Sequence, residues 1–269
     1  MAIQLKDVLR INDLADYKVH FAKWNKVHQP LDIFISDSSH WQRWQEYRPK
    51  MDSFNRRYIF SLAHFYHEVD VWLFTGIYEV VQCHEDRYEV QLLELAAPFI
   101  GRLKLKSSYK ERAVRVNLEG VYDGFEVSEI LAKPFAGRAF TRYEDIYLSF
   151  DEIAVLVRNN RSDWRTALEN VKGIYLITDQ NTGKRYVGSA YGDSGIWSRW
   201  CSYVETFHGG NVELRRLLEE EGSDYCRANL RYALLEHRDL RTPDEVILKR
   251  EEFWKQLLLT RGQQGLNRN

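Results

Sequence analysis

The chain has 269 residues, 44% of them hydrophobic, which is enough for one large domain or two ordinary ones with real cores. Its 38 Lys and Arg against 39 Asp and Glu give a net charge of -1, which argues mildly against a large non-specific nucleic-acid surface but permits a local basic strip. There is no membrane-length apolar run and no signal-peptide pattern, and the three scattered cysteines favour neither a zinc cluster nor a disulfide framework, so a cytoplasmic protein is expected.

The first half of the chain predicts a β-rich domain with helices. Residues 1 to about 50 are expected to be helical or irregular, because Trp41, Trp44 and Tyr47 recur at helical intervals. Several short apolar runs with polar turns lie between 57 and 148 and predict a small barrel or a curled sheet. Ser149 and Glu152 then have the spacing of a capping box for a helix through Val157. We predict domains at 1–165 and 166–269.

A β-hairpin is predicted next. Two short apolar runs, 173–178 and 185–190, flank a turn rich in Asp, Asn and Gly. Strand alternation puts Gly173 and Tyr175 on one face, and Tyr186 and Gly188 on one face of the second strand. The hairpin can therefore bring two phenols together beside two glycines, which leave the backbone open to a close ligand. Because Phe would serve packing equally well, these tyrosines are candidate catalytic groups.

The segments Gly173-Ile174-Tyr175 and Tyr186-Val187-Gly188 resemble the signature of the GIY-YIG nuclease family, closest to its homing-endonuclease and restriction-enzyme branches. Further family marks follow in the right order, which makes the resemblance specific for roughly the last third of the chain. They are Arg199-Trp200 early in a helix, a strand at 230–236, Glu251 before Phe253-Trp254 on a helix, and a terminal Gly265-Leu266-Asn267. The resemblance implies an α+β domain in which helices flank a small three-stranded antiparallel sheet.

The resemblance also implies site residues. Glu251 would anchor Mg²⁺ (or Mn²⁺), since magnesium prefers oxygen ligands and keeps several waters, so one carboxylate is enough. Arg199 would contact the scissile phosphate with its planar fork. Tyr186 is the better candidate for general base and Tyr175 would position it, although a phenol with a pKa near 10 needs help to act as a base.

Other residues of the motif leave alternatives open. Asn267 is expected to be architectural, with its amide tying the terminus to the floor of the site. Some family members carry a histidine where Tyr203 stands; a third phenol can substitute, or the role is absent, so the general base stays open. Glu252 competes with Glu251 for the metal, and the nearby His208 is either a phosphate contact or an exposed loop residue.

A second Gly-Ile-Tyr occurs at residues 76–78, with Tyr88 ten residues later. No glycine, arginine helix or terminal Asn follows it in the family order. We therefore interpret 76–78 as strand residues of the first domain.

The first domain is expected to select or dock DNA. Basic and aromatic residues are interleaved at 40–50 and 56–58, which suits phosphate contact with base stacking. Arg102, Lys104 and Lys106 alternate along a predicted strand. The equally weighted alternative is a helix that packs its Trp face on the sheet with its arginines in water. An aromatic pocket for a flipped or modified base is a further hypothesis.

The sequence thus predicts a metal-dependent DNA endonuclease, with restriction or another defence against foreign DNA as the setting. The alternatives are a mobile-element or structure-specific nuclease, an RNA nuclease, and a nucleic-acid-binding protein with an inactive nuclease fold. Cutting both strands of DNA requires a homodimer or sequential nicking by a monomer. No membrane partner is expected.

Overall fold

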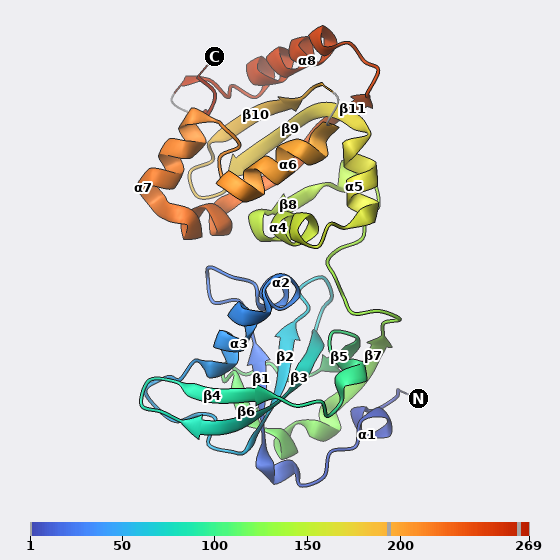
Figure 1. The fold of residues 1–269 in the computed structure, drawn as a ribbon, viewed down its shortest axis with the longest axis vertical. Coiled ribbons are helices and arrows are strands. Elements are labelled where there is room, and N and C mark those ends of the chain that lie inside the picture. The colour runs from blue at the N-terminus through green and yellow to red at the C-terminus, as the bar shows by residue number, and fades with distance from the viewer. Residues whose placement is uncertain (1, 193–194, 263–264, 269) are drawn as a thin grey trace. The chain divides into compact units, whose positions relative to one another are not determined.

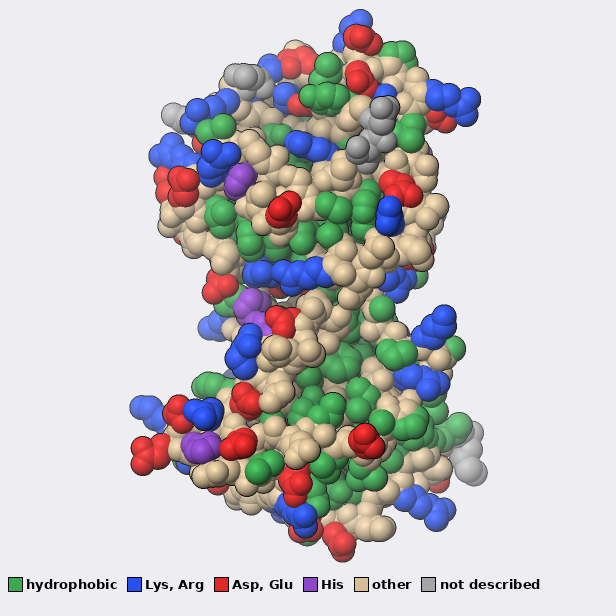
Figure 2. Space-filling model, in the orientation of Figure 1, with side chains coloured by type: hydrophobic (Ala, Val, Ile, Leu, Met, Phe, Trp, Pro, Cys, Tyr) green, Lys and Arg blue, Asp and Glu red, His purple; other side chains and the backbone are tan. Residues whose placement is uncertain are grey.

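The computed structural model describes residues 2–192, 195–262 and 265–268, and the chain forms two compact units (Figure 1). The first comprises residues 1–25 and 29–135, and the second comprises 26–28 and 136–269. Within the described residues no helix combines the length and apolar character that crossing a bilayer requires. Basic and acidic side chains are interspersed on the face shown in Figure 2, in keeping with the near-zero net charge.

The first unit is built on a curled, mixed sheet with strand order β6-β1-β2-β3-β5-β7, and β4 pairs with β3. Strands β1 and β2 are parallel, and the other pairs are antiparallel. Its strands are β1 (Tyr17–Ala22), β2 (Tyr58–His64), β3 (Val71–Cys83), β4 (Tyr88–Leu92), β5 (Leu103–Ser107), β6 (Arg115–Asn117) and β7 (Phe125–Ile130). Its α-helices are α1 (Leu5–Val8), α2 (Pro30–Ser36) and α3 (Ser38–Glu46).

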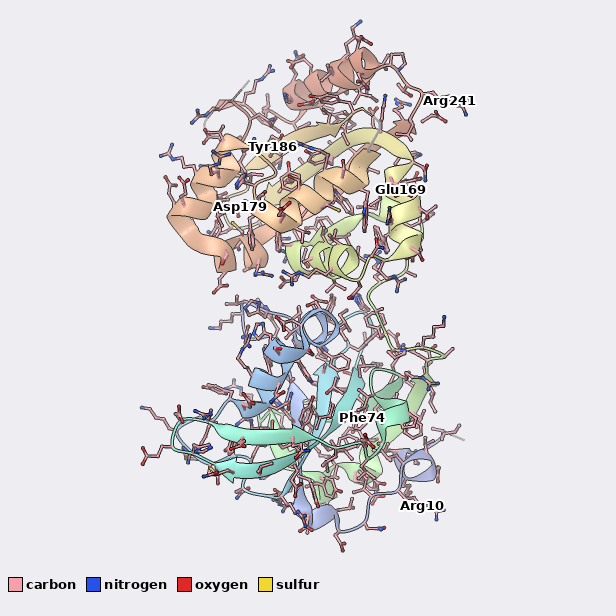
Figure 3. All side chains as sticks on the ribbon, in the orientation of Figure 1. Arg10, Phe74, Glu169, Asp179, Tyr186 and Arg241 are labelled. Carbon is pink, nitrogen blue, oxygen red and sulfur yellow. The ribbon has the colours of Figure 1, made fainter. Side chains whose placement is uncertain are left out.

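Strand β1 shows that the prediction of helical or irregular structure for the first fifty residues is wrong in part. Val19 and Phe21 are fully buried within it, because their side chains pack into an apolar cluster that includes Leu5 and Phe60. Phe74 of β3 is also fully buried, in the same apolar cluster (Figure 3). Gly76-Ile77-Tyr78 lies inside β3, which confirms its interpretation as strand.

The second unit contains a four-stranded antiparallel sheet in the order β10-β9-β11-β8. Its strands are β8 (Tyr147–Ser149), β9 (Val171–Asp179), β10 (Arg185–Ala190) and β11 (Leu230–Asp239). Its helices are α4 (Phe150–Arg158), α5 (Ser162–Glu169), α6 (Gly195–Thr206), α7 (Val212–Asn229) and α8 (Asp244–Leu257). The α+β class is as predicted.

The second unit begins earlier in the chain than the predicted boundary at 165/166. Ser149 of β8 pairs with Arg231 of β11, so a fourth strand joins the predicted three-stranded sheet. Helices α4 and α5 bury Ile153 and Trp164 in the same core. The capping box at the start of α4 is confirmed, since Ser149 Oγ accepts the Glu152 N–H at 3.1 Å and Glu152 Oε2 accepts the Ser149 N–H at 2.8 Å.

The two faces of this sheet have separate cores. Alternate residues of β9, including Tyr175 and Ile177, face the larger core, to which helices α4 to α7 contribute. Ile174 of β9 and Val187 of β10 face the other way, onto Ile247 of α8. Residues of β10 that point to opposite faces of the sheet therefore meet different helices: those on one face meet the core of α4 to α7, and those on the other meet α8.

Candidate active site

Three phenols cluster on the α6 face of the β9–β10 hairpin. The register pairs Tyr175 with Gly188 and Ile177 with Tyr186, so both tyrosines point to the same face, with ring centroids 6.3 Å apart. Tyr203 of α6 joins them, and its Oη lies 3.0 Å from that of Tyr175. Tyr175 and Tyr203 are fully buried, whereas Tyr186 (Figure 3) remains partly exposed. Tyr186 is therefore the phenol of the three that solvent or a ligand reaches.

The two hairpin glycines accommodate neighbouring protein groups rather than a ligand. A Cβ on Gly188 would lie 2.5 Å from Cζ and Oη of Tyr175, and one on Gly173 would lie 2.2 Å from the carbonyl oxygen of Glu236. The expectation that the glycines leave the backbone open to a ligand is therefore wrong. Their space is filled by the Tyr175 ring and by β11.

We predict that Gly188→Ala lowers the free energy of unfolding by about 1–3 kcal/mol, because the buried Tyr175 ring has to move away from the added methyl group. Gly124→Ala is the matched control, since its Cβ meets nothing within 4 Å. Chemical denaturation of the two variants checks this, and equal stabilities would contradict the packing role of Gly188.

Arg199 of α6 places a cation against the phenols. Its Nε and Nη2 groups donate to Tyr175 Oη at 3.4 and 3.3 Å, and the guanidinium is half-buried. Burial opposes the charge, but the surrounding phenols, Tyr175 first, raise the pKa of Arg199 above its usual value. Within the described residues Arg199 forms no ion pair. A half-buried cation with neutral partners is a receptive position for an anion.

The phenols themselves hold their protons. Burial, followed by the neighbouring Tyr175 and Glu251, raises the pKa of Tyr186, and Arg199 offsets this only in part. Burial also raises the pKa of Tyr203 well above its usual value. Both hydroxyls are therefore protonated at neutral pH and act as hydrogen-bond donors until something nearby stabilises the phenolate.

Glu251 reaches the same strand from its other face. Its Oε2 accepts a hydrogen bond from the Ser189 hydroxyl on β10, and its Oε1 forms an ion pair with Lys255 Nζ at 2.7 Å. Its side chain is 14% exposed. Glu251 thus contacts β10 through Ser189, and Tyr186 of the same strand points to the other face, toward Tyr175.

Asn267 fastens the last residues to this edge. Its Oδ1 accepts the Val187 N–H at 2.9 Å and its Nδ2 donates to the Val187 carbonyl at 2.8 Å. Leu266 N–H donates to the Arg185 carbonyl at 2.8 Å. Along the free edge of β10, the backbone N–H and C=O groups of every second residue point away from β9. The terminal segment bonds to those of Arg185 and Val187, so Ser189 is the next residue whose backbone groups point outward from this edge.

The chemistry of Glu251 fits a hard, hydrated cation. Among the described residues no group of three or more His, Cys, Asp or Glu side chains could hold a metal ion, so the donor set there does not suit a closed protein cage. Magnesium is commonly held by one or two carboxylates, with water and substrate phosphate completing its shell. Glu251 is a single carboxylate of this kind, with one oxygen bonded to Ser189 and the other paired with Lys255.

The structure separates Glu251 from its sequence neighbour. Glu252 binds the Arg261 guanidinium through both oxygens, at 2.7 and 2.6 Å, whereas Glu251 bonds to Ser189 of β10. His208 Nδ1 accepts the Gly210 N–H at 3.0 Å, a local loop contact.

Two residues of the site were missed in the sequence. Ser189 follows Gly188, so alternation points it at α8, and Lys255 lies four residues after Glu251, which is the spacing of a helical ion pair. Both signals were present in the sequence, but they became informative only once α8 was placed on this face of the sheet.

The basic residues of the predicted strand in the first unit do not form a phosphate-binding face. Lys104 is 4% exposed and its Nζ bonds to Glu68 and Glu129, so its charge is neutralised. Arg102 donates to the backbone carbonyls of Leu131 and Pro98. Lys104 is therefore not available to a phosphate, whereas Lys106 is exposed, so the alternating basic face is interrupted at its middle residue.

Comparison with known proteins gives limited overlap. No model of a known protein family matches the chain, and no curated protein matches it. A structure of the catalytic domain of the homing endonuclease I-TevI is 26% identical, covers 36% of this chain and 98% of its own, and has a TM-score of 0.29. A point mutant of the catalytic domain of the intron endonuclease I-TevI is 26% identical, covers 36% of this chain and 92% of its own, and has a TM-score of 0.28. TM-scores this low do not establish a shared fold.

Proposed function

We propose that this protein is a divalent-metal-dependent endonuclease that hydrolyses DNA phosphodiester bonds. The observation that carries the proposal is the half-buried Arg199 guanidinium, which faces the Tyr175 hydroxyl and has no ion-pair partner in the described residues. An anion completes such a site, and a phosphodiester is an anion whose two free oxygens match the guanidinium fork. Tyr186 shares this face of the hairpin with Tyr175, and Glu251 contacts Ser189 on the other face of the same strand.

In this proposal each side chain has a separate task. Arg199 orients the scissile phosphate and offsets the charge that grows on its oxygens. Tyr175, fixed by Tyr203 at 3.0 Å, holds Arg199 in place. Tyr186 is the partly exposed phenol and positions the attacking water or accepts its proton.

Glu251 would hold Mg²⁺ or Mn²⁺, which supplies Lewis-acid stabilisation of the phosphoryl and leaving oxygens when bound. Asn267 has an architectural task, since its two bonds to Val187 keep the strand beneath the site from shifting.

We also propose restriction or another defence against foreign DNA as the setting, with the first unit selecting the DNA. Cutting both strands would need a homodimer or sequential nicking, because one such site cuts one strand at a time.

The test is digestion of modified and unmodified phage DNAs with the full-length protein and Mg²⁺ or Mn²⁺, with the fragment ends sequenced. Cleavage that stops when EDTA is added supports the proposal, and discrimination between modified and unmodified DNA supports the defence setting. Cleavage of none of these DNAs, together with tight DNA binding, would favour a binding protein with an inactive nuclease fold.

A further expected result concerns Lys255. Lys255→Met removes the cation that shares the Glu251 carboxylate, so the metal concentration for half-maximal cleavage should fall severalfold. The matched control is Arg261→Met, which frees Glu252 and should leave the metal requirement unchanged. Metal titrations of cleavage by the two variants check this, and an unchanged requirement in Lys255→Met would show that Lys255 does not compete for the carboxylate.

A further inference from the structure

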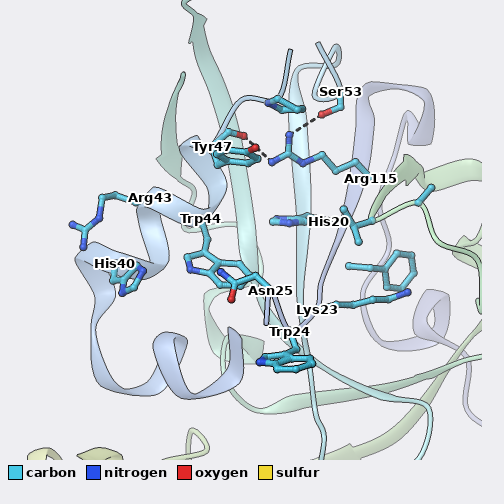
Figure 4. A pocket seen from close by; sticks show the side chains of 14 residues that line it. His20, Lys23, Trp24, Asn25, His40, Arg43, Trp44, Tyr47, Ser53 and Arg115 are labelled. Carbon is cyan, nitrogen blue, oxygen red and sulfur yellow. Dashed lines mark hydrogen bonds between the residues drawn. The ribbon is translucent and has the colours of Figure 1, made fainter. Parts of the chain in front are cut away.

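The first unit contains a large cavity that the proposed active site does not use (Figure 4). It has a volume of about 820 Å³ and is walled by the end of β1 and the residues after it, by α3 and the following loop, and by the chain leading into β6. That volume falls within the usual range of small-molecule sites, about 300–1,000 Å³.

Aromatic rings line one part of this cavity. Trp24 and Tyr47 are 56% and 65% exposed, although rings of this size are normally covered. Trp44 also lines the cavity, and its ring stacks on the buried Trp41 with centroids 6.2 Å apart. The α3 helix packs Trp41 on the sheet, as one of the two alternatives predicts, and Trp44 lines the cavity. Two exposed rings, together with a third that stacks on a buried neighbour, suit a flat heteroaromatic ligand.

The charged residues of the lining favour a ligand with a negative charge. The lining includes Lys23, Arg43 and Arg115 and contains no Asp or Glu. Aromatic walls alone would also suit a quaternary ammonium ion, but three cations without a carboxylate repel one. The cavity is therefore suited to an anionic ligand that has an aromatic ring.

Arg115 gives the strongest indication of an anion. Its guanidinium lies over the Phe54 ring at 3.9 Å and donates to Ser53 Oγ and to the Tyr47 carbonyl, both at 2.7 Å. Burial lowers the pKa of Arg115 to about 10, so it still carries its charge at neutral pH. In the described part of the chain it forms no ion pair. The carboxylate of Asp52, which accepts the Tyr88 hydroxyl, raises the pKa of Arg115 but does not line the cavity, so a ligand in the cavity can still supply a direct partner.

His20 adds a directional hydrogen-bonding group. It is buried, lines the cavity, and lies between Trp44 and Arg115 in Figure 4. Its Nδ1 donates to Gln45 Oε1 at 2.8 Å, and burial, reinforced by Arg115, lowers its pKa to about 4. The ring is therefore neutral at physiological pH, with Nε2 left as an acceptor for a ligand N–H group.

We propose that this cavity binds one nucleotide of a DNA strand whose base has left the base stack. The base would stack on the tryptophan rings, its hydrogen-bonding edge would meet His20, and its phosphate would pair with the cationic side chains, Arg115 first. Because extrusion costs a few kcal/mol from a paired duplex and less from a mismatch, single-stranded and mismatched DNA bind more tightly than matched duplex. The choice of DNA as ligand rests on the proposed function. In this proposal the first unit recognises DNA by binding the unstacked nucleotide in its cavity.

The test measures binding to the full-length protein in EDTA, where no metal-dependent cleavage occurs. The probes are a single-stranded oligonucleotide, a matched duplex, and a duplex with one central 2-aminopurine opposite a mismatched base. We expect tighter binding of the first and third probes, with a change in 2-aminopurine fluorescence on binding. Trp24→Ala, which alters an exposed side chain, should weaken binding by about tenfold, as expected for the loss of one base–aromatic stack. Val81→Ala is the control, a substitution of a 55% exposed apolar residue of the same unit outside the cavity.

Three outcomes would overturn the proposal. One is Trp24→Ala binding all probes as tightly as Val81→Ala, and another is matched duplex binding as tightly as the mismatched one. The third is a free deoxynucleoside 5′-monophosphate binding as tightly as the oligonucleotides, which would make the ligand a free nucleotide instead of DNA. Because binding is measured without metal, loss of cleavage in phage-DNA digestion would refute the proposed nuclease and leave this result intact.

Discussion

Glu251→Gln should abolish metal-dependent DNA cleavage, with a loss of at least about a thousandfold in rate, while DNA binding stays within a few-fold of wild type. The amide keeps the size of the side chain and can still accept the Ser189 hydroxyl bond, so the packing of α8 on β10 is preserved. What is lost is the negative charge, and a neutral amide is a poor anchor for Mg²⁺. Single-turnover cleavage and filter binding measure the two quantities separately.

The adjacent residue supplies the control for Glu251. Glu252→Gln makes the same chemical change one position away, where the carboxylate binds Arg261 and makes no bond to β10 in the described residues. It should cut at close to the wild-type rate. Full cleavage by Glu251→Gln in magnesium, or equal losses in the two variants, would refute the assignment of Glu251 as the metal anchor.

The hairpin was the most predictable part of the fold because strand alternation is local. When 173–178 and 185–190 pair in the register that puts Tyr175 opposite Gly188, Tyr175 and Tyr186 share a face. What local pattern did not predict is how the glycines are used. The Gly188 position is filled by the Tyr175 ring itself, a contact that depends on the three-dimensional register and not on the glycine alone.

The remainder of the site depends on long-range packing. Ser189 meets Glu251 across 62 residues of chain, and only the docking of α8 on the β10 face brings them together. The same limit applies to the domain boundary: the pairing of Ser149 with Arg231 assigns β8 to the second unit, and nothing in its three-residue strand indicates a partner so far along the chain. In the first unit Lys104 looked like a phosphate contact because its acidic partners, Glu68 and Glu129, lie on other segments.

Arg199→Ala should lose about a thousandfold or more in cleavage rate, because it removes the cation that we propose contacts the scissile phosphate. Arg199→Lys keeps the charge but not the planar fork, so it should recover only part of that loss. Neither variant should unfold the protein, since Tyr175 and Tyr203 still bond each other at 3.0 Å. Arg199→Ala also removes a half-buried unpaired charge, and Arg199→Lys adds none. Thermal denaturation and single-turnover cleavage distinguish lost chemistry from lost structure.

Arg216→Ala is the matched control for Arg199. Its guanidinium is exposed on α7 and pairs with Glu220 at 2.7 Å, so its removal should leave cleavage close to wild type. A stable Arg199→Ala protein that still cuts at the wild-type rate would mean that Arg199 braces Tyr175 without touching the phosphate. In that case the half-buried cation would be a structural partner of the phenols, and the main support for the proposed phosphodiesterase site would be gone.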